Sequence, residues 1–231
     1  MKCLCVVACL SLLPASALAQ QQTRVVGLLA LPEVFGNGAC DRFTPQDVPL
    51  YGAPDSARII GRIRVDEGWT ASSNGGCEGL RVGVHMTGTE PLPTKEYSYE
   101  EPGAIVLARR DEWFQIRLAT GSAWVRSSPR DRFHPLEQLL LAGLTYLTEA
   151  WDGRLAPSAA APSRPARIET RSSQPSVRIV RSQRIRGELW FDLEVITSPC
   201  EDPNVKALDR GWVPAHTMSG EPVIWFHSRG C

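Results

Sequence analysis

Histidine and cysteine are the residue types in this chain that most often carry catalysis or bind metals, and their spacing favours neither role. A zinc hydrolase needs closely spaced His and Glu ligands with one open coordination position, and no such spacing surrounds the histidines. A cysteine peptidase needs a free thiolate beside an imidazole, whereas the cysteines are better explained as disulfides. We therefore expect no enzyme activity, no catalytic or metal-binding residue and no cofactor. The histidines are His85, His134, His216 and His227.

Residues 1–19 have the composition of a cleavable secretory signal. A single charge at Lys2 precedes an apolar run that ends at Leu13, and Ala17-Leu18-Ala19 has the A-x-A pattern of a cleavage site. The run stops at Pro14, short of the roughly 20 apolar residues that a membrane span needs. The sequence therefore predicts a secreted or periplasmic protein with no integral membrane segment after cleavage.

One stretch of sequence occurs twice. Residues 113–118 read W-F-Q-I-R-L and residues 190–195 read W-F-D-L-E-V, and a glycine and a Trp-Val pair follow each of them, at residues 124–125 and 212–213. An alternating strand that leads through a turn into a second strand is typical of a β-hairpin. The two occurrences predict two related small β modules.

Four cysteines remain after removal of residues 1–19, and an even number in an exported chain indicates disulfides. Four cysteines allow three connectivities, and the pairing of neighbours is favoured because each bond then lies within one module. A four-ligand zinc site is the alternative, but no C-x-x-C or H-x-x-x-H spacing accompanies these cysteines. The expected bonds join Cys40 to Cys77 and Cys200 to Cys231.

The aromatic residues are the best candidates for a binding surface. In an extended strand Phe114 and Ile116 share one face, and Trp113 lies on the opposite, more polar face. We expect the polar-face tryptophans to line a groove with nearby tyrosines, since indoles favour interfaces that are wet on one side. The alternative, that each tryptophan is a structural lid over a barrel end, stays open. The candidate groove residues are Tyr97, Tyr99, Trp113, Trp124, Trp190 and Trp212.

The charge balance argues against nucleic acid as a partner. Basic and acidic residues each number 25, and the sequence pI is near neutrality, whereas nucleic-acid-binding domains carry a basic excess. Arginines do cluster between Arg164 and Arg186, where Glu169 is the only acidic residue. A solvated linker and strand face explains this cluster, and weak adhesion to an anionic surface is the alternative.

The chain divides into four segments after the signal. Residues 24–128 read as short strands separated by Gly, Pro, Asn and Asp, and we expect a first barrel there. Pro135 and the leucines that follow it at helical spacing predict, within residues 133–152, an amphipathic helix of about four turns packed on that barrel. Residues 153–175 have the Ala, Pro, Ser and Arg composition of a flexible linker. Residues 176–231 form the expected second barrel.

Several motifs resemble those of bacterial SH3-like domains of exported proteins. They are L-Y-G-A-P-D at residues 50–55, I-G-R-I at residues 60–63, the W-x-x-aliphatic strand and the G-W-V close of residues 211–213. The resemblance covers about half of residues 49–128, and only the last two motifs carry it in the second module. It implies, for each module, a small, five-stranded, partly open barrel used for binding. The expected fold is thus mainly β, with two small SH3-like partly open barrels, one amphipathic α-helix and a flexible linker.

The resemblance also implies a class of partner. SH3-like domains of this kind often bind peptidoglycan stem peptides or a partner protein. We expect an exported, non-enzymatic binding module of the bacterial cell envelope that recognises peptide or wall polymer, with peptidoglycan as its partner. The alternative is a protein-interaction adaptor or an inhibitor that engages another exported protein.

Overall fold

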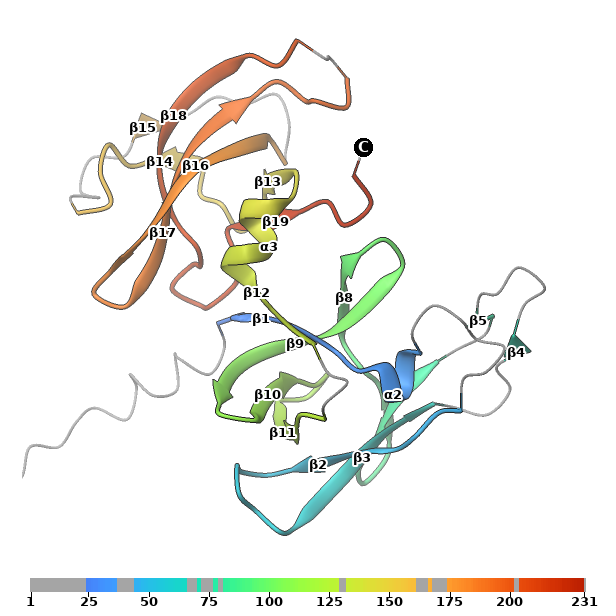
Figure 1. Cartoon of the computed structure of the whole chain (residues 1–231). Helices are drawn as coiled ribbons and strands as arrows, with labels where there is room; N and C mark the ends of the chain where they lie inside the picture. Colours follow the sequence, from blue (N-terminus) through green and yellow to red (C-terminus); the bar gives the residue numbers. More distant parts are fainter. Residues whose placement is uncertain are drawn as a thin grey trace, which may run out of the picture.

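The chain is mainly β, as the sequence predicts, and is built from two sheets with a short helix between them (Figure 1). The computed structural model describes residues 24–36, 44–65, 81–128, 132–160, 174–201 and 204–230, and describes residues 70–71, 77–78 and 166–167 by backbone alone. The signal segment 1–19, Cys40 and Cys231 lie outside the described residues.

The first sheet is ten-stranded and curled, and all its strands lie between residues 27 and 135. Its order is β12-β1-β9-β10-β11-β2-β3-β6-β7, and β8 pairs with β9 off this path. The short helix α2 (Pro32–Phe35) follows β1, and β4 (Thr70–Ala71) pairs with β5 (Cys77–Glu78). The strands are β1 (Gly27–Ala30), β2 (Val48–Tyr51), β3 (Ile59–Val65), β6 (Val82–His85), β7 (Thr89–Pro91), β8 (Thr94–Ser98), β9 (Glu101–Arg110), β10 (Trp113–Arg117), β11 (Ser122–Arg126) and β12 (Arg132–Pro135).

The second sheet is five-stranded, with the order β18-β17-β16-β13-β19. The first of its strands along the chain, β13, lies well before residue 176, where the second barrel was expected to begin. A separate two-stranded ladder joins β14 (Arg154–Leu155) to β15 (Ala166–Arg167). The strands of the second sheet are β13 (Thr145–Leu147), β16 (Ser176–Ile185), β17 (Glu188–Ile196), β18 (Ala207–Pro214) and β19 (Ile224–Phe226).

The two W-F strands pair with their W-V strands in the same register. In the β10–β11 hairpin Gln115 lies opposite Trp124, and in β17–β18 Asp192 lies opposite Trp212. Each W-F strand also pairs with the strand that precedes it, and the two pairings have a register shift at equivalent positions. In the first the shift follows Gln115, and in the second it lies beside the residue that pairs with Asp192. The hairpin pairing inferred from the repeat is therefore confirmed.

The structural repeat is longer than the repeat visible in the sequence. Strands β1, β9, β10, β11 and β12 have the same pairing order as β13, β16, β17, β18 and β19; we call these five-strand units the first copy and the second copy. Following the registers outward from the hairpins makes Phe133-His134 equivalent to Phe226-His227. In the same alignment of the two copies, residues 27–33 correspond to residues 143–149, and both segments read G-L-x-x-L-x-E. Residues 48–98 are then an insertion in the first copy, between its first two strands.

The helix α3 (Leu136–Ala142) is shorter than the four turns expected within residues 133–152. It buries Leu136 and Leu140 and ends at Gly143, whose backbone is extended. The leucine pattern continues past this point, but Thr145–Leu147 pair with β16 and β19 as a strand. Strand pairing over long sequence distances therefore outweighs a local helical periodicity, which is a weak preference by comparison.

The expected flexible linker is in part packed on the second copy. Leu155 and Ala156 are buried, and Ala156 exchanges two backbone hydrogen bonds with Trp212, of 2.8 and 2.9 Å. Ala159 is buried in the same cluster. An alanine side chain is small enough to pack closely against an indole ring. A segment of low hydrophobicity can therefore still be buried on the second copy. Residues 161–165 and 168–173 of this segment lie outside the described residues.

The two copies share one hydrophobic core and are not separate modules. Leu28 and Ile105 of the first copy belong to the same buried cluster as Leu140 of α3 and as Phe191 and Leu193 of the second copy. A second cluster fills the inside of the first sheet, around Leu50, Ile63 and Ile116. Strands β1 and β9 are therefore covered on both faces, because their outward residues pack against α3 and the second copy.

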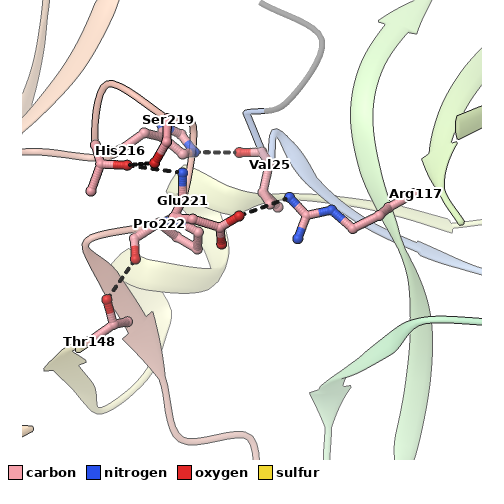
Figure 2. Close-up of polar contacts among 8 residues, drawn as sticks. Val25, Arg117, Thr148, His216, Ser219, Glu221 and Pro222 are labelled. Carbon is pink, nitrogen blue, oxygen red and sulfur yellow. Dashed lines mark hydrogen bonds and ion pairs between the residues drawn. The ribbon is translucent and has the colours of Figure 1, made fainter. Parts of the chain in front are cut away.

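Polar contacts also join the two copies (Figure 2). The His216 Nε2–H donates a 2.8 Å hydrogen bond to the backbone oxygen of Val25, and Glu221 lies 3.8 Å from Arg117 of β10. Burial lowers the pKa of His216, so the imidazole is neutral at pH 7 and serves as a donor. Arg24, which precedes the first copy, forms a 2.8 Å ion pair with Glu188 of β17. These contacts link the two copies beside the shared core.

Candidate functional site

The six expected groove residues do not share one surface. Trp113 packs edge-on against Tyr51, with ring centroids 5.1 Å apart, and is 7% exposed. Trp212 is equally buried, and Trp190 packs beside it. Each of these contacts lies within one copy or against the segment that covers it, which matches the structural-lid interpretation better than the groove.

The remaining members of the predicted groove divide between the Trp113–Tyr51 contact and the junction of the copies. Trp124 is half-buried opposite Tyr51. Tyr97 is half-buried on β8 at the junction of the copies, and Tyr99, just beyond β8, is 61% exposed. The guanidinium of Arg229 lies over the Tyr99 ring, 5.3 Å from its centroid. The two tyrosines therefore belong to the region where the C-terminal segment meets the first copy.

A pocket of about 340 Å³ opens at this region, which we call the junction pocket. Its walls come from the end of β8, from β12, from the C-terminal half of α3 and from the end of β19, so neither copy forms it alone. Of the residues singled out in the sequence as groove candidates, Tyr97 is the one that lines it. The lining residues are Tyr97, Ser98, His134, Gln138, Leu139, Ala142, Gly143, Phe226, His227 and Ser228.

Two equivalent histidines face the junction pocket, one from each copy. The His134 ring stacks on Tyr97 with centroids 4.3 Å apart and planes 15° from parallel. The His227 ring lies 4.6 Å from Tyr146, tilted by 40°. The duplication thus supplies a histidine from each side, while Tyr97 comes from the insertion and Tyr146 from β13. Sequence reasoning missed this pair of histidines, although the dipeptide Phe-His occurs only at residues 133–134 and 226–227.

His134 is poorly solvated in the junction pocket. Burial lowers its pKa, while Glu101 raises and Arg132 lowers it by smaller amounts. Its Nε2 atom is buried and has no hydrogen-bond partner among the described residues. Burial also raises the pKa of the Tyr97 hydroxyl. The imidazole is therefore neutral at pH 7, and the tyrosine keeps its proton as a donor.

An ion pair fastens the C-terminal segment beside the pocket. The Glu96 carboxylate on β8 accepts hydrogen bonds from the Arg229 guanidinium, from Nε at 2.9 Å and also from Nη2, and from Ser228 Oγ at 2.8 Å. These bonds, those from Arg229 above all, lower the pKa of Glu96 to about 2. Because Ser228 and its neighbour His227 line the pocket, the ion pair fixes one of its walls.

Buried Asp192 is the other charged group that stands out, and its surroundings explain it as structural. It is 3% exposed and accepts hydrogen bonds from Arg210 and Arg181 at 2.9 to 3.1 Å. The Arg210 hydrogen bond is the main cause of its lowered pKa. A carboxylate held ionised by two guanidinium groups is poorly suited to transfer protons near neutral pH.

The cysteines are only partly described. Cys200 lies in the turn after β17. Cys77 is described by its backbone alone, in β5, and Cys40 and Cys231 lie outside the described residues. Both expected pairings, Cys40 with Cys77 and Cys200 with Cys231, stay predictions.

The wider comparisons add no assignment to this site. Within the described parts of the chain, no three His, Cys, Asp or Glu side chains are grouped so that they could hold a metal ion. No helix among the same residues is long and apolar enough to cross a bilayer. Comparisons of the chain with protein-family models, with curated proteins and with solved structures find no match.

Proposed function

We propose that this chain is an exported, non-enzymatic binding protein of the bacterial cell envelope, and that it binds a peptide or wall polymer in the junction pocket. The pocket itself is the observation that carries the proposal. Its volume of about 340 Å³ falls in the range of roughly 300–1,000 Å³ typical of small-ligand sites, and such sites occur preferentially where domains meet. The shared core and the polar contacts of the junction keep its walls in place before any ligand arrives.

The compartment and the type of module belong to the same proposal. The signal-like residues 1–19 support export, which brings the chain to peptidoglycan or to another exported protein. The five-stranded second copy and the identical hairpin registers support two related SH3-like barrels. The insertion of residues 48–98, which enlarges the first sheet to ten strands, gives the first copy its own form of that barrel.

Retention of the mature protein on purified wall sacculi tests this function. Ala142 lines the pocket and is exposed at the end of α3, so Ala142→Trp fills the pocket without entering the core. Leu141→Trp is the matched control, because Leu141 is 52% exposed and does not line the pocket. We expect sacculi to retain the wild type and Leu141→Trp, and to lose most of Ala142→Trp at an unchanged thermal midpoint.

Two results would change the proposal. Full retention of Ala142→Trp would remove the pocket from the binding surface. Failure of sacculi to retain the wild type, together with capture of one discrete exported protein that Ala142→Trp no longer captures, would favour the adaptor or inhibitor.

A further inference from the structure

The junction pocket is rich in hydrogen-bond donors and poor in charge. The residues that line it include two imidazoles, the Gln138 amide and the hydroxyl groups of Tyr97 and Ser228, and none of the described lining residues is Asp, Glu, Lys or Arg. The Glu96 carboxylate beside it is already engaged by Arg229 and Ser228. A ligand entering the pocket therefore meets the two imidazoles, the Gln138 amide and the Tyr97 hydroxyl, whereas the Ser228 hydroxyl is already bonded to Glu96.

We propose that the junction pocket binds a carboxylate group of its ligand, held by the imidazoles of His134 and His227, and that binding takes up a proton. This inference rests on the proposed function, in which the junction pocket is the ligand site. Because Nε2 of His134 is buried, a ligand would contact this ring through Nδ1. Histidine is the side chain that can become positively charged near neutral pH. The equivalence of the two histidines means that the duplication itself created the pair.

The surroundings of His134 explain why a proton accompanies the ligand. Burial lowers the pKa of His134 and keeps its imidazole neutral, with Glu101 and Arg132 acting in opposite directions. A carboxylate close to the ring favours the charged form and shifts its pKa upward. His227 lies against the uncharged Tyr146 ring, and the neighbouring Arg229 is neutralised by Glu96. A ligand carboxylate would add a negative charge beside both rings.

The same features favour a carboxylate over a phosphate. Phosphate sites usually rely on Arg or Lys forks or on the N–H groups at a helix N-terminus. None of the described lining residues is Arg or Lys, and α3 reaches the pocket with its C-terminal turn. The carbonyl groups of that turn carry partial negative charge, which favours protonated histidines and disfavours a dianion more than a singly charged carboxylate.

Calorimetric titration of the mature chain tests the inference with a matched pair of probes. N-acetyl-dialanine carries a free carboxylate, and N-acetyl-dialanine amide differs only in lacking it. We expect the acid to bind roughly tenfold more tightly at about pH 6 than at about pH 7.5, because the protonated fraction of a histidine changes by about that much. Buffers of different ionisation enthalpy should report proton uptake, and the amide and glycerol phosphate should bind at least about tenfold more weakly at the lower pH.

Histidine variants separate a role in binding from a role in folding. His134→Gln keeps a neutral donor and should remove most of the pH dependence. His227→Gln provides the second variant should His134→Gln fail to fold, because His227 is exposed. His85→Gln, on β6 and outside the pocket, is the control and should behave as the wild type. Persistence of the pH dependence in both pocket variants would overturn the inference, as would equal binding of acid and amide or preference for glycerol phosphate.

The failure of this inference is distinguishable from failure of the proposed function. If Ala142→Trp abolishes retention by sacculi while acid and amide bind alike, the pocket is the binding site and its carboxylate selectivity is disproved. If Ala142→Trp affects neither sacculi nor the acid probe, both the site and the inference fall.

Discussion

Equivalent positions in the two copies show how single residues adapt one backbone to two surroundings. Gln115 is buried and donates a 2.8 Å hydrogen bond to Ser122 Oγ, whereas the equivalent Asp192 accepts hydrogen bonds from Arg181 and Arg210. Both solutions satisfy a polar side chain that lies out of water, which would otherwise cost about 1–3 kcal/mol. The hairpin register therefore fixes the position, and the neighbours decide whether an amide or a carboxylate suits it.

The buried tryptophans provide a test at the residue scale. Trp113 and Trp212 are each 7% exposed, so we expect either Trp→Ala change to lower the free energy of unfolding by about 3–5 kcal/mol, the range for truncating a buried aromatic residue. Urea denaturation measures this loss, and Tyr99→Ala, at a 61% exposed ring, is the control expected to cost less than about 1 kcal/mol. Loss of wall binding with unchanged stability in Trp113→Ala would restore the groove interpretation.

The Glu96 carboxylate gives a pH dependence of stability with a defined sign. Its pKa in the folded chain is about 2, below the ordinary value of 4.5, so the unfolded chain binds more protons between these values. The contribution of Glu96 to stability is complete above pH 4.5 and is lost as the pH falls toward about 2. Thermal midpoints measured across this range should fall less steeply in Glu96→Gln than in the wild type. Parallel profiles would show that the ion pair contributes nothing to folding.

The packing of neighbouring strands depends on how closely their backbones approach as well as on their side chains. Gly27 opens β1, where an added Cβ would lie 2.3 Å from the His134 backbone oxygen. Gly143 holds the equivalent position in the second copy, and an added Cβ there would lie 3.4 Å from Phe226 Cβ. The backbone therefore lies closer to its neighbours at Gly27 than at Gly143.

The two glycines form a matched pair for measurement. We expect Gly27→Ala to destabilise the fold by about 1–3 kcal/mol or more, as overpacking does. The added Cβ would clash with a backbone oxygen, which cannot move away as a flexible side chain can. Gly143→Ala should stay within about 1 kcal/mol, since its extended backbone accepts any residue. Equal effects of the two substitutions in urea denaturation would argue against the different strand spacing.

At the scale of the whole molecule, the shared core makes the two copies one folding unit. Leu140 of α3 is 1% exposed and belongs to the cluster that joins the copies. Leu140→Ala should therefore destabilise both copies together, by about 2–5 kcal/mol. The chain should unfold in one transition when followed by tryptophan fluorescence. The transition should be the same in Trp113→Phe, which lacks one reporter in the first copy, and in Trp212→Phe, which lacks one in the second. Two separated transitions, with only one moved by Leu140→Ala, would indicate independent modules.

The sequence by itself determined the mainly β class and the pairing of each W-F strand with its W-V strand. These features rest on period-two alternation and on turns a few residues long, and both are local. The tertiary structure alone decided that Thr145–Leu147 form a strand, that part of the expected linker packs under Trp212, and that His134 and His227 meet at one pocket. Each of these depends on partners from distant parts of the chain. No local pattern encodes that choice, because it is made by the register of the strands and by the burial of one apolar face on another.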